Sequence, residues 1–516
     1  MHESSRLHPR HVDPTVPMEG RRRTVAMVVL CLCALTTAID VTITNVALPF
    51  IGKELDAGVS DLQWVIDAYN IVLAGLLVLG GGLADRFGRR RVYLGGYALF
   101  GLACLLAALS TSTGELIGAR ALMGVGAAAV VAPALAIVAA MYPPDERGKA
   151  IALWAVFGAA GLAIGPVVGG FLLDHFWWGS VFLVNVPLVA IGVVVGIAVI
   201  PDSRKPGRGR LDVAGALLSV AGLGILLFGV IEGPERGWGS ALVLGALVVG
   251  TTFLVAFFLR ESRTESPLLD VRVLRRPIVA AGSATLFVSY FVFTSMLFLV
   301  PQWLQDVQGE QIVTVGLLLV PFAAVFGVAS MRSSQVMTRV GARAIIVGGL
   351  ACCSFGALLL ALLQDSGAGT VAATAVVGVG LAGLIAPAST VVMNDLPEAQ
   401  AGDGSSLNMV SRFVGAAVGV AVVGSILSSL YSDRLGDSID GLAKGPAQVA
   451  DGSLQGALEA SSALPRGAAA ELVTTARDAF DAGAFAAYLV VASVAAIAAL
   501  WAWRSLRSLK LATRPA

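Results

Sequence analysis

The sequence has little charge of either sign. Only 13% of its 516 residues are Asp, Glu, Lys or Arg, against about 25% in a typical soluble chain, while 57% are hydrophobic and the mean hydropathy is +0.83. The 35 Lys and Arg nearly balance the 34 Asp and Glu, so the chain has no basic field that would attract nucleic acid. This composition excludes a soluble enzyme, a disordered protein and a secreted disulfide scaffold.

The sequence is also poor in metal ligands and in nucleotide-binding signals. Its five cysteines lie in apolar runs and are interpreted as small hydrophobic side chains: Cys31, Cys33, Cys104, Cys352 and Cys353. Its four histidines are dispersed, namely His2, His8 and His11 in a polar tail and His175 in a short loop. We therefore expect no metal site. A phosphate-binding loop with Gly-Lys-Ser/Thr, a His-Glu metal motif and a catalytic triad are all missing from the sequence, so we expect neither ATP-driven transport nor an enzyme.

What the sequence does contain is a series of apolar runs of about 20 residues, the length that crosses a bilayer as a helix. These runs predict an all-α polytopic membrane protein with fourteen transmembrane helices. The predicted spans are 24–50, 64–82, 92–109, 116–141, 148–173, 181–200, 211–231, 241–259, 277–300, 313–330, 343–363, 370–392, 405–430 and 482–509. Most Lys and Arg lie in the two tails and in alternate loops, which predicts that both termini are on the cytoplasmic side of the plasma membrane.

The spans divide into two sets of six with two helices inserted between them. We predict a cytoplasmic tail (1–23), an N-terminal six-helix bundle (24–200), two inserted helices with flanking cytoplasmic loops (201–276), the first five helices of a C-terminal bundle (277–430), a long extracellular loop (431–481), and the last helix with a cytoplasmic C-terminus (482–516). The outer loop is rich in Gly, Ala, Ser and acids, and either an irregular loop or an amphipathic helix around 468–480 fits its sequence.

A weak internal repeat supports this division. The run LADRFGRR at 83–90 follows the second span, and VMTRVGAR at 336–343 follows the tenth. Arg, Gly and Arg recur at the same spacing in both runs. Repeated halves on either side of a midplane site are the architecture of secondary transporters.

Four ionisable residues fall inside predicted spans, namely Asp40, Asp67, Arg120 and Arg412. A charge at the bilayer centre costs about 2.5–3.5 kcal/mol on insertion scales, so such residues are functional candidates. Asp40, Asp67 and Arg120 are expected in the outer half of the N-terminal bundle, and Arg412 in the inner half of the other.

Our hypothesis is that Asp40 accepts the proton and that Arg120 tunes it, because burial and a nearby guanidinium act in opposite directions on a carboxylate. The alternative is a static ion pair that only fixes helix packing. Asp67 fits either a functional site or the headgroup region. Arg412 fits either helix-end carbonyls or the substrate, with the structural role favoured.

Several motifs resemble those of one transporter family. The run GGLADRFGRRR at 81–91 resembles the signature loop of the major facilitator superfamily, with Gly81, Asp85, Arg86, Gly88, Arg89 and Arg90 at its defining positions. The resemblance implies a cytoplasmic latch that favours the outward-open state, where the residues alone would indicate only positive-inside anchoring.

Further motifs resemble those of the fourteen-helix drug:proton antiporters within this superfamily. They are IDVTITNVALP at 39–49 in span 1, RALMGVGAA at 120–128 in span 4 and GLAIGPVVGG at 161–170 in span 5; Asn408, Arg412 and Gly415 in span 13 also fit. Three positions depart from the family pattern: Met123, where the family often has Gln beside Arg120, and Gly179 and Ser180, where a Trp-Arg-Trp sequence is usual.

The span-5 motif has a mechanical interpretation. Gly161, Gly165 and Gly169 recur every four residues and form a smooth stripe for close helix packing, with Gly170 completing the motif. Pro166 removes one backbone hydrogen bond and kinks the helix. Such a helix could seal one bundle against the other and suppress leakage, although the same stripe is compatible with ordinary membrane packing.

The sequence says less about the substrate. Phe287, Phe291 and Phe298 follow helical spacing on the ninth span with Tyr290 nearby. This stripe could line a cavity for a planar aromatic compound, or face lipid or the core. The candidate cavity residues are Asn45, Tyr69, Phe287, Tyr290, Phe291 and Phe298. The two acids and two arginines in the spans balance, so an organic cation, a neutral compound and a zwitterion all remain compatible with the sequence.

Together these features predict an exporter of amphipathic drugs or antibiotics that works by alternating access. We expect it to use the proton gradient and no cofactor, and to interact with the bilayer, protons and a small molecule, but not with nucleic acid or ATP. The alternatives are a proton symporter or facilitator that imports a small nutrient and, further away, a polytopic membrane enzyme or sensor.

Overall fold

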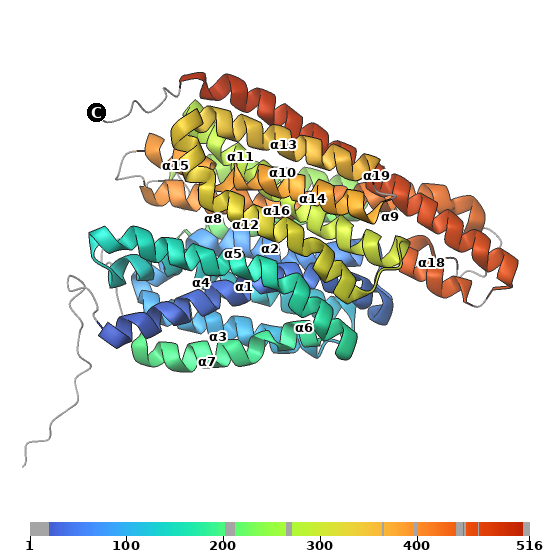
Figure 1. The fold of residues 1–516 in the computed structure, drawn as a ribbon, viewed down its shortest axis with the longest axis horizontal. Helices are drawn as coiled ribbons and strands as arrows, with labels where there is room; N and C mark the ends of the chain where they lie inside the picture. The colour runs from blue at the N-terminus through green and yellow to red at the C-terminus, as the bar shows by residue number, and fades with distance from the viewer. Residues whose placement is uncertain are drawn as a thin grey trace, which may run out of the picture.

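The computed structural model describes residues 20–201, 212–264, 271–363, 366–396, 401–439, 447, 450–462 and 464–508. Every regular element within these ranges is helical (Figure 1). The predicted all-α membrane architecture is therefore confirmed. The first nineteen residues, with their three histidines, and the tail from residue 509 lie outside the described residues.

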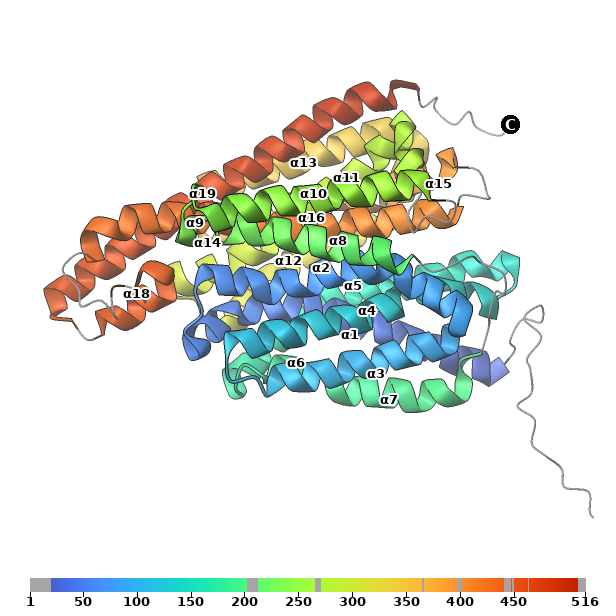
Figure 2. The ribbon, with the colours of Figure 1, turned by 180° about the vertical axis from the view of Figure 1, so that it is seen from behind.

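The first set of helices forms the N-terminal bundle, which occupies the lower half of Figures 1 and 2. Its helices are α1 (Gly20–Leu55), α2 (Val59–Phe87), α3 (Arg89–Ala108), α4 (Thr113–Met141), α5 (Pro144–His175), α6 (Ser180–Leu183) and α7 (Asn185–Val199). The predicted sixth span thus consists of two pieces, α6 and α7. Local signals set the ends: for example, the Ser112 hydroxyl accepts the Glu115 N–H at the start of α4.

The second set forms the C-terminal bundle in the upper half of Figure 1. Its elements are η1 (Val271–Arg275), α11 (Pro277–Gln302), η2 (Trp303–Val307), α12 (Ile312–Val340), α13 (Ala342–Leu362), α14 (Gly367–Ala382), α15 (Ile385–Asp395), α16 (Ala401–Ile439), α18 (Leu454–Ser461), α19 (Arg466–Ser505) and η4 (Leu506–Ser508). The element η2 is a π-helical turn at the end of α11, a feature often found at functional sites.

The internal repeat is visible in the backbone. Gly88 joins α2 to α3 with φ 104°, and Gly341 joins α12 to α13 with φ 89°. Each glycine N–H donates to the carbonyl four residues earlier, Ala84 at 3.0 Å and Met337 at 2.9 Å. Only glycine adopts such a positive φ at low cost, so both halves turn by the same device.

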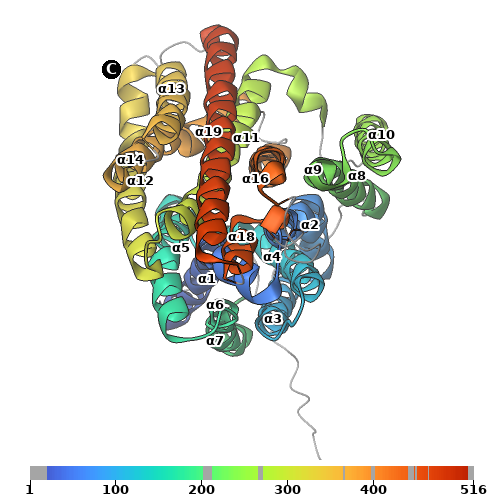
Figure 3. The same cartoon turned by 90° about the vertical axis from the view of Figure 1, so that its right-hand side faces the viewer.

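The inserted helices form a hairpin on one flank of the molecule, beside α2 and α16 (Figure 3). They are α8 (Val213–Ile231), the single turn α9 (Gly233–Arg236) and α10 (Ala241–Arg263). Ile71 of α2, Leu223 and Leu227 of α8, and Ala417 and Ala421 of α16 share one apolar cluster. The inserted hairpin therefore packs against both bundles through α8.

The number of spans agrees with the prediction as far as the described residues allow. Twelve helices are long and apolar enough to cross a membrane, or thirteen if α2, which bends by 52° after Leu77, counts as one span. The predicted span 148–173 falls on α5, a continuous helix of 32 residues, some of whose side chains lie outside the described residues.

The predicted long outer loop needs correction, because much of it is helical. α16 continues to Ile439, α18 is a separate two-turn helix, and α19 already begins at Arg466, so the proposed helix around 468–480 is the first part of the last span. Residues 440–446, 448, 449 and 463 lie outside the described residues. We call the end that carries α18 the outer end, following the charge distribution, and the end that carries Gly88 the inner end.

The contacts between the bundles gather toward the outer end. Gln63 of α2 donates to the carbonyls of Ala421 and Val420 on α16, at 2.9 and 3.3 Å. Gln305 of η2 donates to the Val46 carbonyl of α1 at 3.2 Å. Among the described residues these are the side-chain hydrogen bonds between the two bundles, so the bundles are bonded to each other toward the outer end.

Candidate functional site

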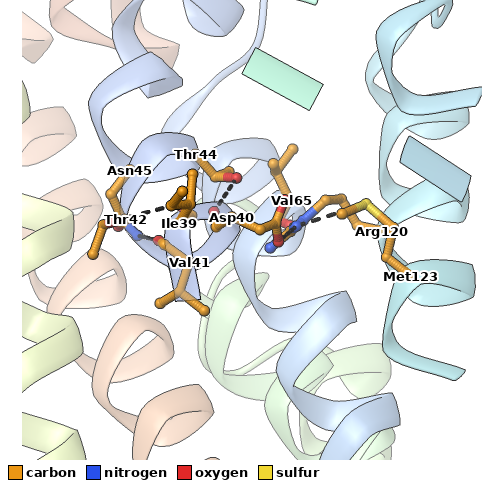
Figure 4. A network of polar contacts seen from close by, with 9 residues as sticks. All are labelled: Ile39, Asp40, Val41, Thr42, Thr44, Asn45, Val65, Arg120 and Met123. Carbon is orange, nitrogen blue, oxygen red and sulfur yellow. Dashed lines mark hydrogen bonds and ion pairs between the residues drawn. The ribbon is translucent and has the colours of Figure 1, made fainter. Parts of the chain in front are cut away.

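The core of the N-terminal bundle contains an ion pair. Arg120 Nη1 of α4 donates to Asp40 Oδ2 of α1 at 2.6 Å, and the two side chains point toward each other (Figure 4). Asp40 is fully buried and Arg120 is only 2% exposed. Asp40 Oδ1 is also buried and makes no hydrogen bond within the described part of the chain. The two residues that the sequence predicted to act together are therefore in direct contact, with one carboxylate oxygen left over.

Arg120 is held by more than its carboxylate partner. Its Nε donates to the Val65 carbonyl of α2 at 2.8 Å, and its guanidinium lies 4.6 Å from the ring centre of Tyr69. Its Nη1 also contacts the sulfur of Met123 at 3.8 Å. The missing polar partner expected from the Met123 departure is thus replaced by a backbone carbonyl, an aromatic face and a thioether. Because these contacts do not depend on Asp40, they can hold the Arg120 side chain in place when Asp40 is neutral.

Asp67 lies well inside α2 and is buried in the protein. α2 begins at Val59, five residues before the predicted span, so Asp67 is more than two turns into the helix. It is fully buried, and neither carboxylate oxygen has a hydrogen-bond partner among the described residues. A buried carboxyl group without a partner is costly, and its role remains a prediction.

Arg412 of α16 joins three helices of the C-terminal bundle. Its Nη2 donates to the Ser389 hydroxyl of α15 at 2.8 Å, and its guanidinium lies 5.7 Å from the Tyr290 ring centre on α11. It is half-buried. The hydrogen-bond partner of Arg412 is thus a side-chain hydroxyl and not the predicted helix-end carbonyl. Arg412 instead has a hydroxyl partner and one face of an aromatic ring.

The predicted latch occupies the α2–α3 turn at the inner end. Arg89 donates to Asp85 Oδ1 through Nε at 3.0 Å and Nη2 at 2.9 Å. Arg90 donates to the Ile197 carbonyl at the end of α7. Arg86 is exposed and stacks on Phe87 at 5.6 Å, and Gly81 lies against Ala132 of α4. The loop ties α2, α3 and α7 together, whereas its effect on the transport cycle stays a prediction.

The glycine stripe of α5 faces α1. A Cβ on Gly161 would lie 2.6 Å from the Leu35 carbonyl oxygen, one on Gly165 would collide with Thr42, and one on Gly169 would lie 2.8 Å from Ile43. The stripe thus lets α5 approach α1 within one bundle. Gly170, the last residue of the motif, is buried.

The opposite side of α5 reaches the other bundle. A Cβ on Gly316 of α12 would lie 2.6 Å from the Pro166 carbonyl oxygen and 3.5 Å from Val167. The motif therefore packs on both sides, against α1 through its glycines and against α12 through its proline backbone. A sealing role for this helix stays a prediction.

The aromatic candidates separate into two groups. Phe291 and Phe298 are buried in the core, at 3% and 0% exposure, which excludes the lipid-facing interpretation for them, while Phe287 and Tyr290 are half-buried. Phe287 and Phe291 stack with ring centres 6.4 Å apart.

Gly415 and Gly419 of α16 approach the backbone of Phe287 and Phe291. Asn45 is buried, with its Nδ2 donating to the Val41 carbonyl at 2.6 Å. Tyr69 is buried against Arg120. Their role as a cavity lining remains a prediction.

The departure at Gly179 has a packing reason. A Cβ there would lie 2.4 Å from the Ala108 carbonyl oxygen and from Trp177 Nε1. The larger residue usual at this position would not fit this arrangement without a shift. Ser180, the next departure, is buried as the first residue of α6.

Sequence reasoning missed the residues that join the bundles at the outer end. These residues are Gln63 and Gln305. Within the C-terminal bundle at the same end, Trp303 of η2 donates to Asp481 of α19 at 2.7 Å, and Gln455 of α18 donates to Asp306. A second missed group is an aromatic ladder of Tyr290, Phe293, Phe322 and Phe326, with neighbouring ring centres 6.1–6.2 Å apart. Single polar residues in apolar runs were the available signal, but the sequence does not show which helices face each other.

Comparison with known proteins was made on this basis. The sequence pattern of the Major Facilitator Superfamily matches residues 30–420. The chain is 33% identical to the multidrug efflux pump LfrA of Mycolicibacterium smegmatis over 488 residues, which cover 93% of this chain and 96% of that one. It is 32% identical to the puromycin resistance protein pur8 of Streptomyces alboniger, covering 84% and 87% of the two chains.

It is also 33% identical to the multidrug resistance protein Stp of Mycobacterium tuberculosis, covering 74% and 71%. Among solved structures, a bacterial homologue of the human lysosomal transporter Spinster, crystallised in an inward-facing and occupied conformation, superposes with a TM-score of 0.65 at 18% identity, covering 95% and 98% of the two chains. This likeness concerns the fold alone.

Proposed function

This chain belongs to the major facilitator superfamily, and we propose that it is a proton-coupled exporter of amphipathic drugs or antibiotics that works by alternating access. The observation that carries the proposal is the fully buried contact between Asp40 and Arg120 in the core of the N-terminal bundle, at 2.6 Å. In this proposal the protein is a transporter in the plasma membrane with both termini in the cytoplasm, and not an enzyme.

The geometry supports an exchange of proton and substrate at Asp40. Protonation of Asp40 removes the negative charge that attracts Arg120. Arg120 then keeps its contacts with the Val65 carbonyl, Tyr69 and Met123. Loss of the proton restores the 2.6 Å ion pair. The pair therefore has two electrostatic states in one packed environment, and a change in how the bundles meet can be linked to the switch between them.

The direction of transport is supported by the packing of α5. The Pro166 backbone meets Gly316 of the other bundle while the glycine stripe meets α1. A helix packed tightly on both sides limits leakage of protons between the bundles, which an exporter that works against a gradient needs. The relatives whose names denote drug efflux and antibiotic resistance support the same direction.

We propose that the protein needs no cofactor and that the proton gradient supplies the driving force. The membrane potential adds about 2.3 kcal/mol per charge per 100 mV when the exchange moves net charge. The substrate is a small amphipathic molecule that enters from the cytoplasm or the inner leaflet. An organic cation is the first class to test, because the buried carboxyl group of Asp67 has no hydrogen-bond partner in the part of the chain that the structure describes.

The first experiment is ethidium efflux from cells that lack their own pumps, with and without a protonophore. We expect efflux that depends on the protein, is abolished by the protonophore and falls to background in Asp40→Asn. The matched control is Asp174→Asn, an exposed acid at the outer end of α5, which should behave like the parent. Protonophore-sensitive efflux that persists in Asp40→Asn would refute the coupling role of this carboxylate.

A further inference from the structure

Asp40 presents a problem of access. The bundles are joined toward the outer end by Gln63 and Gln305, which favours release of a proton from Asp40 toward the inner end. Asp40 is nevertheless fully buried, and its unoccupied Oδ1 is buried as well. A proton route through the protein interior would solve this problem.

A column of polar groups leads away from Asp40 toward the inner end between α1 and α3. Thr36 lies one turn below Asp40 on the same face of α1. Its Oγ1 is 3.0 Å from the Tyr97 hydroxyl, which reaches across from α3. Both side chains are fully buried. Thr36 and Tyr97 thus form a pair of hydroxyl groups one helical turn from Asp40 on the inner side.

The next step repeats this arrangement one turn closer to the inner end. Tyr93 lies four residues, or about one turn, before Tyr97 on α3, and its side chain is fully buried. It makes no hydrogen bond within the described part of the chain. Its ring centre lies 6.5 Å from that of Tyr97, and Cys33 of α1 is buried as well. Buried polar groups without partners are rare in native proteins and call for an explanation.

Toward the inner end, Cys31 is buried on α1 two residues before Cys33, and Tyr142 is the residue that follows α4. Tyr142 is half-buried and lies under the guanidinium of Arg23, 4.8 Å from its ring centre. Arg23 in turn pairs at 3.0 Å with Glu146, whose side chain is 43% exposed. From Asp40 to Cys31 is nine residues of helix, or about 13–14 Å.

We propose that Thr36, Tyr97 and Tyr93 form a proton relay through which Asp40 releases its proton to the cytoplasm while the bundles are bonded to each other toward the outer end. This inference rests on the proposed function, because it assumes that Asp40 carries the coupled proton. The proton leaves Asp40 Oδ1 to a water molecule that bridges the turn to Thr36. Thr36, Tyr97 and Tyr93 in turn accept a proton on the hydroxyl oxygen and pass on their own hydrogen, and water at the inner end takes the proton from Tyr93. One proton moves and no residue is changed at the end.

The test uses the full chain in proteoliposomes with ethidium as the probe. Two rates are measured: ethidium transport driven by an imposed pH gradient, and ethidium exchange without a gradient, which moves no net proton. We expect Tyr97→Phe and Thr36→Val each to slow the driven rate about 10-fold, within the range for loss of a positioned proton-transfer group. Exchange should stay close to that of the parent. Thr36→Ser restores the hydroxyl and should restore the driven rate.

The matched control is Tyr488→Phe, a buried tyrosine of α19 in the other bundle, for which both rates should be unchanged. A driven rate that is normal in Tyr97→Phe and Thr36→Val but lost in Asp40→Asn would overturn the relay and leave the proposed function intact. Equal loss of driven transport and exchange, not rescued by Thr36→Ser, would show a structural role and also overturn the relay. Gradient-driven transport that survives in Asp40→Asn would remove the proposed function and the relay with it.

Discussion

The N-terminal and C-terminal bundles each place an arginine inside a span, but they satisfy it differently. Arg120 is almost fully buried and faces a carboxylate at 2.6 Å, whereas Arg412 is half-buried and faces a hydroxyl and an aromatic ring. An arginine on a carboxylate responds to a proton, while one on a hydroxyl does not. Of the two arginines, only Arg120 is paired with an ionisable group, and the proposed coupling therefore depends on the N-terminal bundle.

The repeated turn shows the same division at the inner end. Arg90 binds the Ile197 carbonyl on the last helix of its bundle, and the corresponding Arg343 lies 3.9 Å from the Trp503 ring centre on the last helix of the other. The Asp85–Arg89 pair of the first turn is replaced by Thr338 and Ala342 in the second. The backbone device is shared by both halves, but only the first turn carries the ionic contact.

The strongest way to break this comparison is to remove each arginine in turn. We expect Arg120→Ala to abolish transport and to lower the free energy of unfolding by about 3–5 kcal/mol, because it leaves the Asp40 carboxylate buried without its cation. Arg412→Ala should cost clearly less, since Ser389 can find other hydrogen bonds. Thermal unfolding in detergent and ethidium efflux measure both effects. Equal losses of stability in the two variants would contradict the contrast between the bundles.

The packing of α5 gives the next largest effect. In Gly165→Ala the new methyl group meets Thr42 of α1, so we expect a loss of stability of about 2 kcal/mol and weaker efflux. Gly316→Ala on α12 meets the Pro166 carbonyl and tests the contact between the bundles. We expect it to raise the rate of proton leakage into proteoliposomes while it lowers stability less than Gly165→Ala does.

Gly158→Ala is the control for both variants, because nothing lies within 4 Å of its Cβ position. A Gly165→Ala protein as stable as Gly158→Ala would contradict the close approach of α5 to α1.

The two turns sharpen the comparison further. Gly88→Ala and Gly341→Ala both place a side chain at a positive φ, so each should cost about 1 kcal/mol of stability. Asp85→Asn should reduce efflux, whereas Thr338→Ala at the corresponding position should leave it unchanged. Efflux rates normalised to protein level provide the measurement. An effect of the same size for both substitutions would show that the ionic contact in the first turn is not what matters.

The smallest expected effect concerns the inserted hairpin, which belongs to neither bundle. Asp212, just before α8, accepts three hydrogen bonds from Arg260 in the last turn of α10 at 2.9–3.1 Å and one from the Gly215 N–H at 2.8 Å. Burial raises the pKa of the Asp212 carboxyl, but the hydrogen bonds and the charge of Arg260 outweigh it and hold the pKa below its usual range.

Because the folded-state pKa is lowered, the stabilisation is present above about pH 4 and is lost as the pH falls below it. We expect Arg260→Gln to reduce the drop in melting temperature between pH 6 and pH 3, relative to the parent. An unchanged pH profile in this variant would contradict the role of the pair.

Much of the fold was predictable because each span records its own length and hydrophobicity. The pairing of Asp40 with Arg120 was predictable as well, since both had to avoid lipid at a similar depth in one bundle. The sequence could not show that Met123 would serve Arg120 or that Gln63 would bond to α16, because helical periodicity reveals a buried face but not the neighbour that buries it. The start of α19 at Arg466 was hard to locate, because an Ala-rich helix that continues beyond the bilayer loses the hydrophobic signal but not its helical propensity.

The inserted hairpin has a consequence for how such a chain can arise. The two halves repeat the same glycine turn after their second helix, at Gly88 and Gly341, so they must enter the bilayer in the same sense. One extra crossing between them would turn the second half upside down and separate Gly341 from the side of Gly88. Two crossings cancel, so α8 and α10 can be gained or lost only as a pair. Parity, rather than any contact that the hairpin makes, is the condition under which fourteen crossings can descend from twelve.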